Sequence, residues 1–444
     1  MFQTIRNAFK IPDLRKRIWF TLFLLAVFRF GAHIPVPYLD ASFMQMFLSG
    51  GGMDLFSMFD VFTGGAFSNA TVMALGVSPY INASIIIQLL TVAIPALERL
   101  AKEGVEGRKK INNITRYVGI ALAFVQGAGL YVTLHNMGIE MNQQVFSNTG
   151  ALGFFVITLT FTAGTAFIVW LGELITEKGL GNGVSLIIFA GIVSAIPGGI
   201  KSVYETYLSA NVSIKSIAMA ALIVIFAIGA IVLVVLFNSA ERKIPVQYAK
   251  RVVGRKMYGG QSTNIPIKVV SGGVMPIIFA SSIMAFPQTV VRLATGGNLP
   301  GPGDFGYTIL SCLSAGYGSG WTDIVYSVLY FLLIIFFTYF YSSIQFNPIE
   351  LANNMKKNGG YIPGYRPGKP TSDFISKVSN RLNLAGALFL GVIAVLPVVA
   401  GAVFGIANLQ IGGTSLLIME GVALETVRQL ESQMVMRHYK GFLE

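Results

Sequence analysis

The residue types that most often carry catalysis or bind metals are few and scattered in this chain of 444 residues. Its three histidines, His33, His135 and His438, lie far apart, and its single cysteine, Cys312, has no partner for an internal disulfide. Residues 179–184 (GLGNGV) resemble a dinucleotide-binding loop, but the final glycine is missing and no soluble strand precedes them. We therefore expect no catalytic residue, no metal site and no cofactor, and we interpret these glycines as a tight turn that opens a helix.

The composition is that of a multispanning membrane protein. Mean hydropathy is +0.66, and only 12% of residues are charged, against roughly 25% in a soluble domain. Apolar runs of about 17–25 residues, the length that crosses a bilayer as a helix, recur along the chain. They are too long and unbroken for barrel strands, so we expect an all-α polytopic protein. About ten spans are expected, near residues 18–34, 71–94, 117–137, 152–174, 184–200, 217–237, 269–291, 324–343, 384–406 and 414–430.

The basic residues orient the chain in the membrane. If segment 1–17 and tail 431–444 are cytoplasmic, nearly all of the 32 Lys and Arg residues lie on the cytoplasmic side, as the positive-inside rule requires. We then expect an N-terminal half at 18–200 and a C-terminal half at 217–430. The cytoplasmic loops at 238–268 and 345–382 are long and basic, which indicates docking of ribosomal RNA or of an acidic partner surface.

Two pairs of similar motifs indicate an internal repeat. Residues 76–85 (GVSPYINASI) resemble residues 273–282 (GVMPIIFASS), 197 positions further on, and residues 183–188 (GVSLII) resemble 413–418 (GTSLLI). In the expected orientation, the members of each pair cross the membrane in opposite directions. That pattern is typical of inverted-topology repeats, which place a functional site at the midplane where the two halves meet.

An isoleucine occupies the matching position of each motif pair, and these four residues suggest a pore constriction. A narrow apolar ring can gate by dewetting and so resist ions without binding them. The alternative, that they are ordinary core residues, has similar weight on the residues alone. An ion-coupled secondary transporter also stays nearly level with a channel, and a structural scaffold is disfavoured by the polar residues inside the spans. The four residues are Ile81, Ile278, Ile188 and Ile418.

Residues 54–69 (DLFSMFDVFTGGAFSN), between the first two spans, are apolar and contain glycine but are too short to cross a bilayer. An extracellular loop and a re-entrant segment in a cavity both fit this composition. In the second basic loop, Arg366 has proline and glycine on both sides, which predicts a stiff turn.

Longer motifs resemble the SecY family, the central subunit of the bacterial protein-conducting channel. The resemblance is carried by residues 74–90, 170–183, 363–368 and 412–418, and it extends over essentially the whole chain. It implies two inverted-repeat halves of five helices each, which form a clamshell around an hourglass pore. It also implies a passive pore rather than an enzyme, through which unfolded proteins cross the membrane and apolar segments leave sideways into lipid.

The resemblance further implies roles for individual residues, with Ile85 and Val184 assigned from it alone. The pore ring would comprise Ile81, Ile85, Val184, Ile188, Ile278 and Ile418. A short helix called the plug would lie at about 54–69 and include Asp54, Leu55, Phe56, Phe59, Phe62, Gly64 and Gly65. Partner docking would involve Lys250, Arg251, Arg255, Lys256 and Arg366.

Partners and location follow from the same resemblance. SecE and SecG would complete a heterotrimeric channel, and the SecA motor and the ribosome would dock on the cytoplasmic loops. Signal sequences and unfolded polypeptide would be the substrates. A lateral gate to the lipid bilayer would lie between the second and third spans on one side and the seventh and eighth on the other. The chain would be a multi-pass protein of the bacterial cytoplasmic (inner) membrane, with both termini cytoplasmic.

Overall fold

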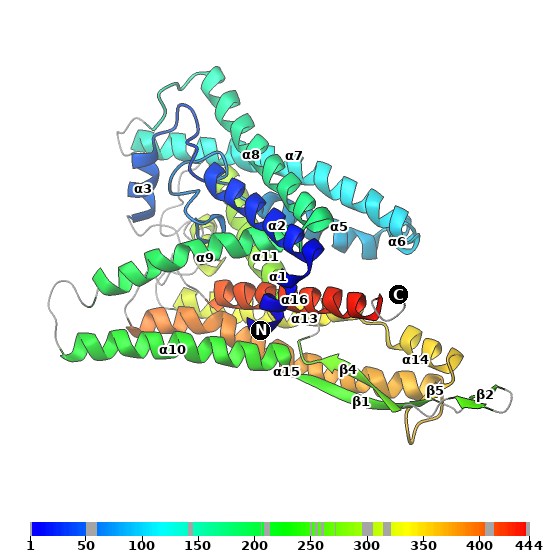
Figure 1. Ribbon diagram of the computed structural model, residues 1–444. Helices are drawn as coiled ribbons and strands as arrows, with labels where there is room; N and C mark the ends of the chain where they lie inside the picture. The colour runs from blue at the N-terminus through cyan, green and yellow to red at the C-terminus, as the bar shows by residue number, and fades with distance from the viewer. Residues whose placement is uncertain are drawn as a thin grey trace. The chain divides into compact units, whose positions relative to one another are not determined.

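The computed structural model describes residues 2–49, 60–140, 145–205, 207, 214–248, 251–253, 256–258, 262–270, 272–294, 305–313, 321–404 and 413–440 (Figure 1). Each apolar run expected to span the membrane overlaps a helix, which confirms the all-α prediction. The helices that correspond to the expected spans are α2 (Pro12–Gly31), α5 (Ser78–Ala93), α7 (Val105–Glu140), α8 (Ala151–Lys178), α9 (Gly183–Tyr204), α10 (Ile214–Ser239), α11 (Met275–Ala294), α13 (Trp321–Gln345), α15 (Lys369–Phe404) and α16 (Gly413–Lys440). Shorter helices are α1 (Phe2–Lys10), α3 (Ala41–Ser49), α6 (Pro95–Lys102), α12 (Phe305–Leu313) and α14 (Pro348–Lys357).

In the described part of the chain, six helical stretches are long and apolar enough to cross a membrane. A seventh is added if α5 and α6 are counted as one span, although the chain bends by 101° between them. The bend has a local cause, because Ile94 is extended (φ −107°, ψ 115°) and Pro95 follows it. A residue before proline is disfavoured in the helical region. The number of ten spans therefore remains a prediction.

The paired motifs adopt the same local structure. Gly76 and Gly273 both have left-handed backbones, with φ +56° and +57°, and α5 and α11 each begin two residues later. A proline, Pro79 or Pro276, is the second residue of each helix, a position where its missing N–H costs nothing. Span 71–94 therefore starts as a helix at Ser78 and not at residue 71. In the second pair, a glycine opens each of α9 and α16, so the internal repeat is visible in the backbone.

The chain forms two compact units. One contains Met1–Ala220, Ser282–Ser327 and Val398–Glu444, and the other contains Ala221–Ser281 and Val328–Pro397. In the first unit, α7 packs against both α5 and α8 (Figure 1). Glycines allow the close approach, because a Cβ at Gly119 would lie 3.4 Å from the Cα of Tyr80 on α5, and one at Gly127 would lie 3.5 Å from the Cβ of Phe161 on α8.

A hydrophobic core joins the segment after α2 to α7 and α8 in the first unit. Phe67 and Ala74, which precede α5, are almost completely buried there. They pack with Leu134 of α7 and with Ile157 and Phe161 of α8, all of which are also buried. The chain between α3 and α5 is thus held by two long helices over at least part of its length.

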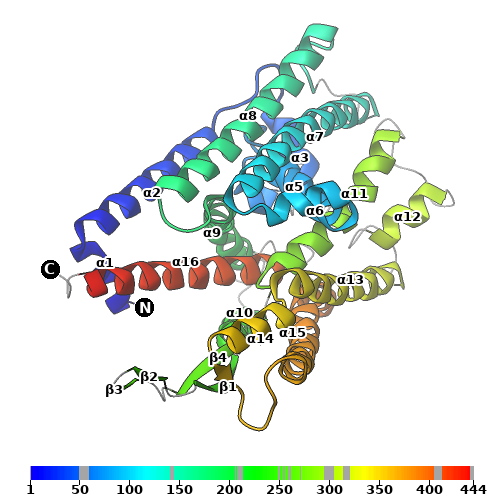
Figure 2. The same ribbon diagram turned by 90° about the vertical axis from the view of Figure 1, so that its right-hand side faces the viewer.

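In the second unit, the expected loop at 238–268 contains a β-ribbon. Strand β1 (Glu241–Tyr248) pairs antiparallel with β4 (Ser262–Lys268) on one edge and with β5 (Gly360–Tyr361) on the other. Two short strands, β2 (Arg251–Val253) and β3 (Lys256–Tyr258), pair with each other. Ile244, Val246 and Ile267 of the ribbon are buried against residues of α14 and α15, beside which Figure 2 shows β1 and β4. This loop is therefore ordered by its own apolar core.

Candidate pore, plug and docking sites

Arg29, near the end of α2, contacts the second half of the predicted plug. Its Nη1 donates a hydrogen bond to the carbonyl oxygen of Gly64 at 2.8 Å. Gly64 has φ +66°, and a Cβ added to it would lie 2.4 Å from Ser194 Oγ and 3.0 Å from Gly191 Cα, both on α9. A Cβ at Gly191 would in turn lie 2.2 Å from the carbonyl oxygen of Phe62. The two backbones touch, so neither glycine can be replaced without displacing the segment.

Polar contacts within residues 60–71 fix the same segment internally. The Asp60 carboxylate accepts a 2.7 Å hydrogen bond from the backbone N–H of Ser68, while burial raises the pKa of Asp60. Asn69 Nδ2 donates to the Gly65 carbonyl at 2.8 Å, and Thr71 Oγ1 donates to the Ala66 carbonyl at 2.9 Å. Plug residues Phe62, Gly64 and Gly65 therefore lie in an ordered turn. The others, Asp54, Leu55, Phe56 and Phe59, lie outside the described residues.

The predicted ring residues come from the starts of four repeat helices. On α5, Ile81 is half-buried and Ile85 is buried; on α9, Val184 is half-buried and Ile188 is buried. Val184 packs on α8, since its Cγ2 is 3.0 Å from the position of a Cβ on Gly172. The remaining two are Ile418, which is buried on α16 in the first unit, and Ile278, which is half-buried on α11 in the second unit.

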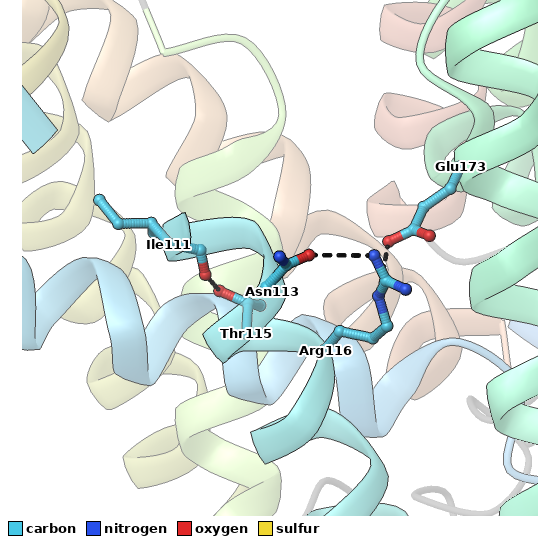
Figure 3. Close-up of polar contacts among 5 residues, drawn as sticks. All are labelled: Ile111, Asn113, Thr115, Arg116 and Glu173. Carbon is cyan, nitrogen blue, oxygen red and sulfur yellow. Dashed lines mark hydrogen bonds and ion pairs between the residues drawn. The ribbon is translucent and has the colours of Figure 1, made fainter. Parts of the chain in front are cut away.

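An ion pair between α7 and α8 was missed at the sequence level. Arg116 Nε lies 3.2 Å from Glu173 Oε1, and Arg116 Nη2 donates to Asn113 Oδ1 at 3.2 Å (Figure 3). The hydroxyl of Tyr80 on α5 is close enough to interact electrostatically with both Arg116 and Glu173. Glu173 falls inside an expected span, and an ionisable residue in such a place is a functional candidate by default. That rule applied to residues 152–174 would have identified it.

The docking residues fall on the ribbon and on the turn before α15. Lys250 and Arg255 lie outside the described residues, whereas Arg251 begins β2 and Lys256 begins β3. Arg366 is exposed on a turn that contains Gly364 at φ +87°.

Contacts on both sides restrain this turn. Tyr365 N–H donates to the Ile362 carbonyl at 3.0 Å, Thr371 Oγ1 donates to the Arg366 carbonyl at 2.8 Å, and the Tyr365 ring stacks on Phe374 at 4.2 Å. The prediction of a restrained turn around Arg366 is confirmed. Within the described residues, no group of three His, Cys, Asp or Glu side chains could hold a metal ion.

Comparisons with known proteins identify the family. The SecY family model matches residues 71–427. The chain is 44% identical over 453 residues to the protein translocase subunit SecY of Mycobacterium tuberculosis H37Rv, and 43% identical over 460 residues to that of Streptomyces griseus. Both alignments cover 100% of this chain and 100% of the relative.

Solved structures agree with this assignment at the level of the fold. A protein-conducting channel matches with TM-score 0.67 and 20% identity, and the canine Sec61 of a ribosome–channel complex matches with TM-score 0.63 and 19% identity. Each match covers 97% of this chain and 97% of the other. Family model, full-length sequence identity and fold lead to one conclusion: this multi-pass membrane protein belongs to the SecY family.

Proposed function

We propose that this chain is the pore-forming subunit of a protein-conducting channel, which passes unfolded secretory proteins across a membrane and releases apolar segments sideways into lipid. The observation that carries the proposal is identity of 42–44% with translocase subunits, in alignments that cover 100% of this chain and 100% of each relative. The pore is passive and not an enzyme, and a motor ATPase or a ribosome supplies the driving force.

The seal of the pore is the apolar ring of Ile81, Ile85, Val184, Ile188, Ile278 and Ile418. The repeat supports four of them, because Ile81 and Ile278, like Ile188 and Ile418, lie equally far from the starts of helices that begin with matching Gly-x-x-Pro or Gly-x-Ser turns. Ile85 and Val184 are assigned from the family resemblance alone. Branched apolar side chains in a narrow ring exclude water and hence ions, but they yield to an extended polypeptide because they bind nothing specifically.

Residues 54–69 act as a plug that blocks the closed pore and moves aside during translocation. The contacts of Gly64 with Arg29 and Gly191 support this role, because they place the described part of the segment against α2 and against α9, the helix that carries Val184 and Ile188. Release of the plug then requires a modest free-energy gap between its docked and displaced states.

The β-ribbon and the Arg366 turn are the docking surface for the driving partner, SecA or the ribosome. Lys250, Arg251, Arg255 and Lys256 are grouped within seven residues of sequence, and Arg366 follows the strand that pairs with the same ribbon. Clustered cations suit phosphate or carboxylate surfaces. SecE and SecG are the expected membrane subunits, the membrane is the bacterial cytoplasmic one, and both termini are cytoplasmic.

A flux experiment distinguishes this channel from a secondary transporter of similar symmetry. Vesicles containing the chain with its copurified subunits are supplied with SecA, ATP and a secretory precursor, and the precursor protected from protease is measured. Protected precursor without exchange of small solutes supports the channel. Coupled exchange of a small solute without protected precursor would identify a transporter.

A further inference from the structure

The second unit contains an open cavity of about 750 Å³ between the last turns of α13 and the first half of α15. Hydroxyl and amide side chains from both helices line it, together with Phe336, Phe340 and Phe346. Tyr339, also in the lining, donates its hydroxyl to the Asn380 carbonyl at 3.4 Å. The cavity lies away from the predicted ring and plug residues in sequence. Six of its lining residues belong to the expected loop at 345–382, where the proposed function gives a role only to the Arg366 turn.

One polar group in the cavity wall lacks a partner. The Asn383 side chain is only 3% exposed, and its Nδ2 donates to Ser342 Oγ at 2.6 Å. Its Oδ1 is buried and has no hydrogen-bond partner among the described residues. Buried polar atoms are nearly always satisfied, so an unpartnered carbonyl oxygen in a cavity wall indicates a missing donor.

The sequence places this cavity at the level of lipid headgroups. Four charged residues occur in α15 from Lys369 to Arg381, after which the helix turns apolar at Leu384. On the apolar side, Phe336 is 58% exposed, Leu384 is 48% exposed and Leu388 is 43% exposed. Exposed aromatic and aliphatic residues directly below a charged helical segment mark a membrane–water interface.

Charge next to the cavity favours an anion. A neighbouring cavity of about 440 Å³ shares Ser376 and Asn380 with the first and is also lined by Asp373, Lys377 and Arg381. Two cations and one carboxylate leave a net positive charge there. Guanidinium and ammonium groups at this depth suit a phosphate oxygen.

We propose that the cavity binds the headgroup of a phospholipid. Lys377 and Arg381 contact the phosphate, a donor on the headgroup reaches Asn383 Oδ1, and an acyl chain lies along Phe336 and Leu384. A glycerol headgroup combines a net negative lipid with hydroxyl donors, and an ethanolamine headgroup offers an ammonium donor on a neutral lipid. A choline headgroup has no donor and is the poorest fit.

The test uses the full chain with its copurified subunits, in phosphatidylcholine vesicles that contain a trace of photoactivatable phosphatidylglycerol. Crosslinked peptides are expected from the last turns of α13 and from α15 near Asn383. Unlabelled phosphatidylglycerol should compete for crosslinking severalfold better than phosphatidylcholine. Phosphatidylethanolamine, which is neutral but has a donor, shows as a competitor whether the negative charge or the headgroup donor contributes more to binding. Absence of lipid crosslinks at this site would overturn the proposal, as would a polypeptide crosslinked there from a photoreactive residue at Ser343.

Matched variants separate binding from folding. Asn383→Leu should reduce crosslinking about fivefold or more, whereas Thr338→Val, which removes a buried hydroxyl one turn before Ser342, should not. Lys377 and Arg381 are both exposed, so the double substitution Lys377→Gln with Arg381→Gln should abolish the preference for phosphatidylglycerol without affecting folding. Its control, Lys356→Gln with Lys357→Gln on α14, removes equal charge and should leave the preference intact. If both double variants lose the preference for phosphatidylglycerol equally, the preference arises from the general surface potential. That result would contradict a specific site.

Discussion

At the residue scale, the docked position of the proposed plug rests on contacts that only glycine permits. Gly64 combines a left-handed backbone with three atoms of Arg29, Ser194 and Gly191 within 3.0 Å of where a Cβ would stand. We expect Gly64→Ala to destabilise the docked plug by about 1–3 kcal/mol, the usual cost of such strain. Ion conductance of vesicles should rise, while Gly229→Ala, where a Cβ meets nothing within 4 Å, serves as control. Unchanged conductance in Gly64→Ala would show that this contact does not hold the plug.

The Arg29 guanidinium donates a hydrogen bond to the carbonyl oxygen of Gly64 in the proposed plug. Arg29→Gln should lose a charge-assisted hydrogen bond worth about 1.5–3 kcal/mol and leak ions. Arg29→Lys, which keeps a charged donor, should leak less than Arg29→Gln. If both variants leak equally, packing and not the hydrogen bond accounts for the effect.

The proposed apolar ring makes a third prediction at this scale. Ile81→Asn and Ile278→Asn should each raise ion conductance by about an order of magnitude and relax the requirement for a functional signal sequence, because polar side chains wet a constriction. Ile81→Leu and Ile278→Leu are the volume-matched controls. Planar-bilayer conductance and export of precursors with defective signals are the measurements. Wild-type behaviour of both Asn variants would mean that these residues are ordinary core.

At the scale of elements, the Arg116–Glu173 ion pair joins α7 to α8 beside α5. Both side chains remain partly exposed, at 43% and 34%, so the pair should be worth no more than about 1 kcal/mol. A double-mutant cycle of Arg116→Gln and Glu173→Gln, followed by thermal unfolding in detergent, measures that coupling. Additive effects of the two substitutions would indicate that the ion pair does not stabilise the helix packing.

Sequence patterns predicted the elements well where one strong signal governs them. Long apolar runs required helices, but the expected starts of two spans, at 71 and 269, were too early, because α5 and α11 begin only after the left-handed Gly76 and Gly273. The bend at Ile94 could have been anticipated from Pro95. The β-ribbon could not, because its apolar residues alternate over only a few positions and are buried by α14 and α15, a tertiary effect. The Arg29–Gly64 contact likewise joins residues 35 positions apart, for which a single sequence carries no spacing rule.

At the scale of the whole molecule, the proposed function gives the chain a pore and a docking surface but no chemistry, so the driving force would arrive through the loops at 238–268 and 345–382. Arg366 is the residue to test, because its turn is restrained on both sides. Arg366→Glu should abolish SecA-driven translocation. Arg366→Lys should impair it, since an ammonium cannot reproduce the planar contacts of a guanidinium. The exposed Lys369→Glu is the nearby control for charge alone. Full activity of Arg366→Lys would remove the case for specific recognition, and full activity of Arg366→Glu would remove any docking role.

The central claim is that polypeptide passes through this chain, and a translocation intermediate tests it directly. A secretory precursor with a folded C-terminal domain is arrested during SecA-driven translocation, with photoreactive residues placed at Ile81, at Ile278 and, as a control outside the ring, at the exposed Val232 of α10. Crosslinks from both ring positions to the same stretch of precursor, with none from the control, are the predicted result. Precursor that becomes protected from protease without a crosslink from either ring position would contradict the account.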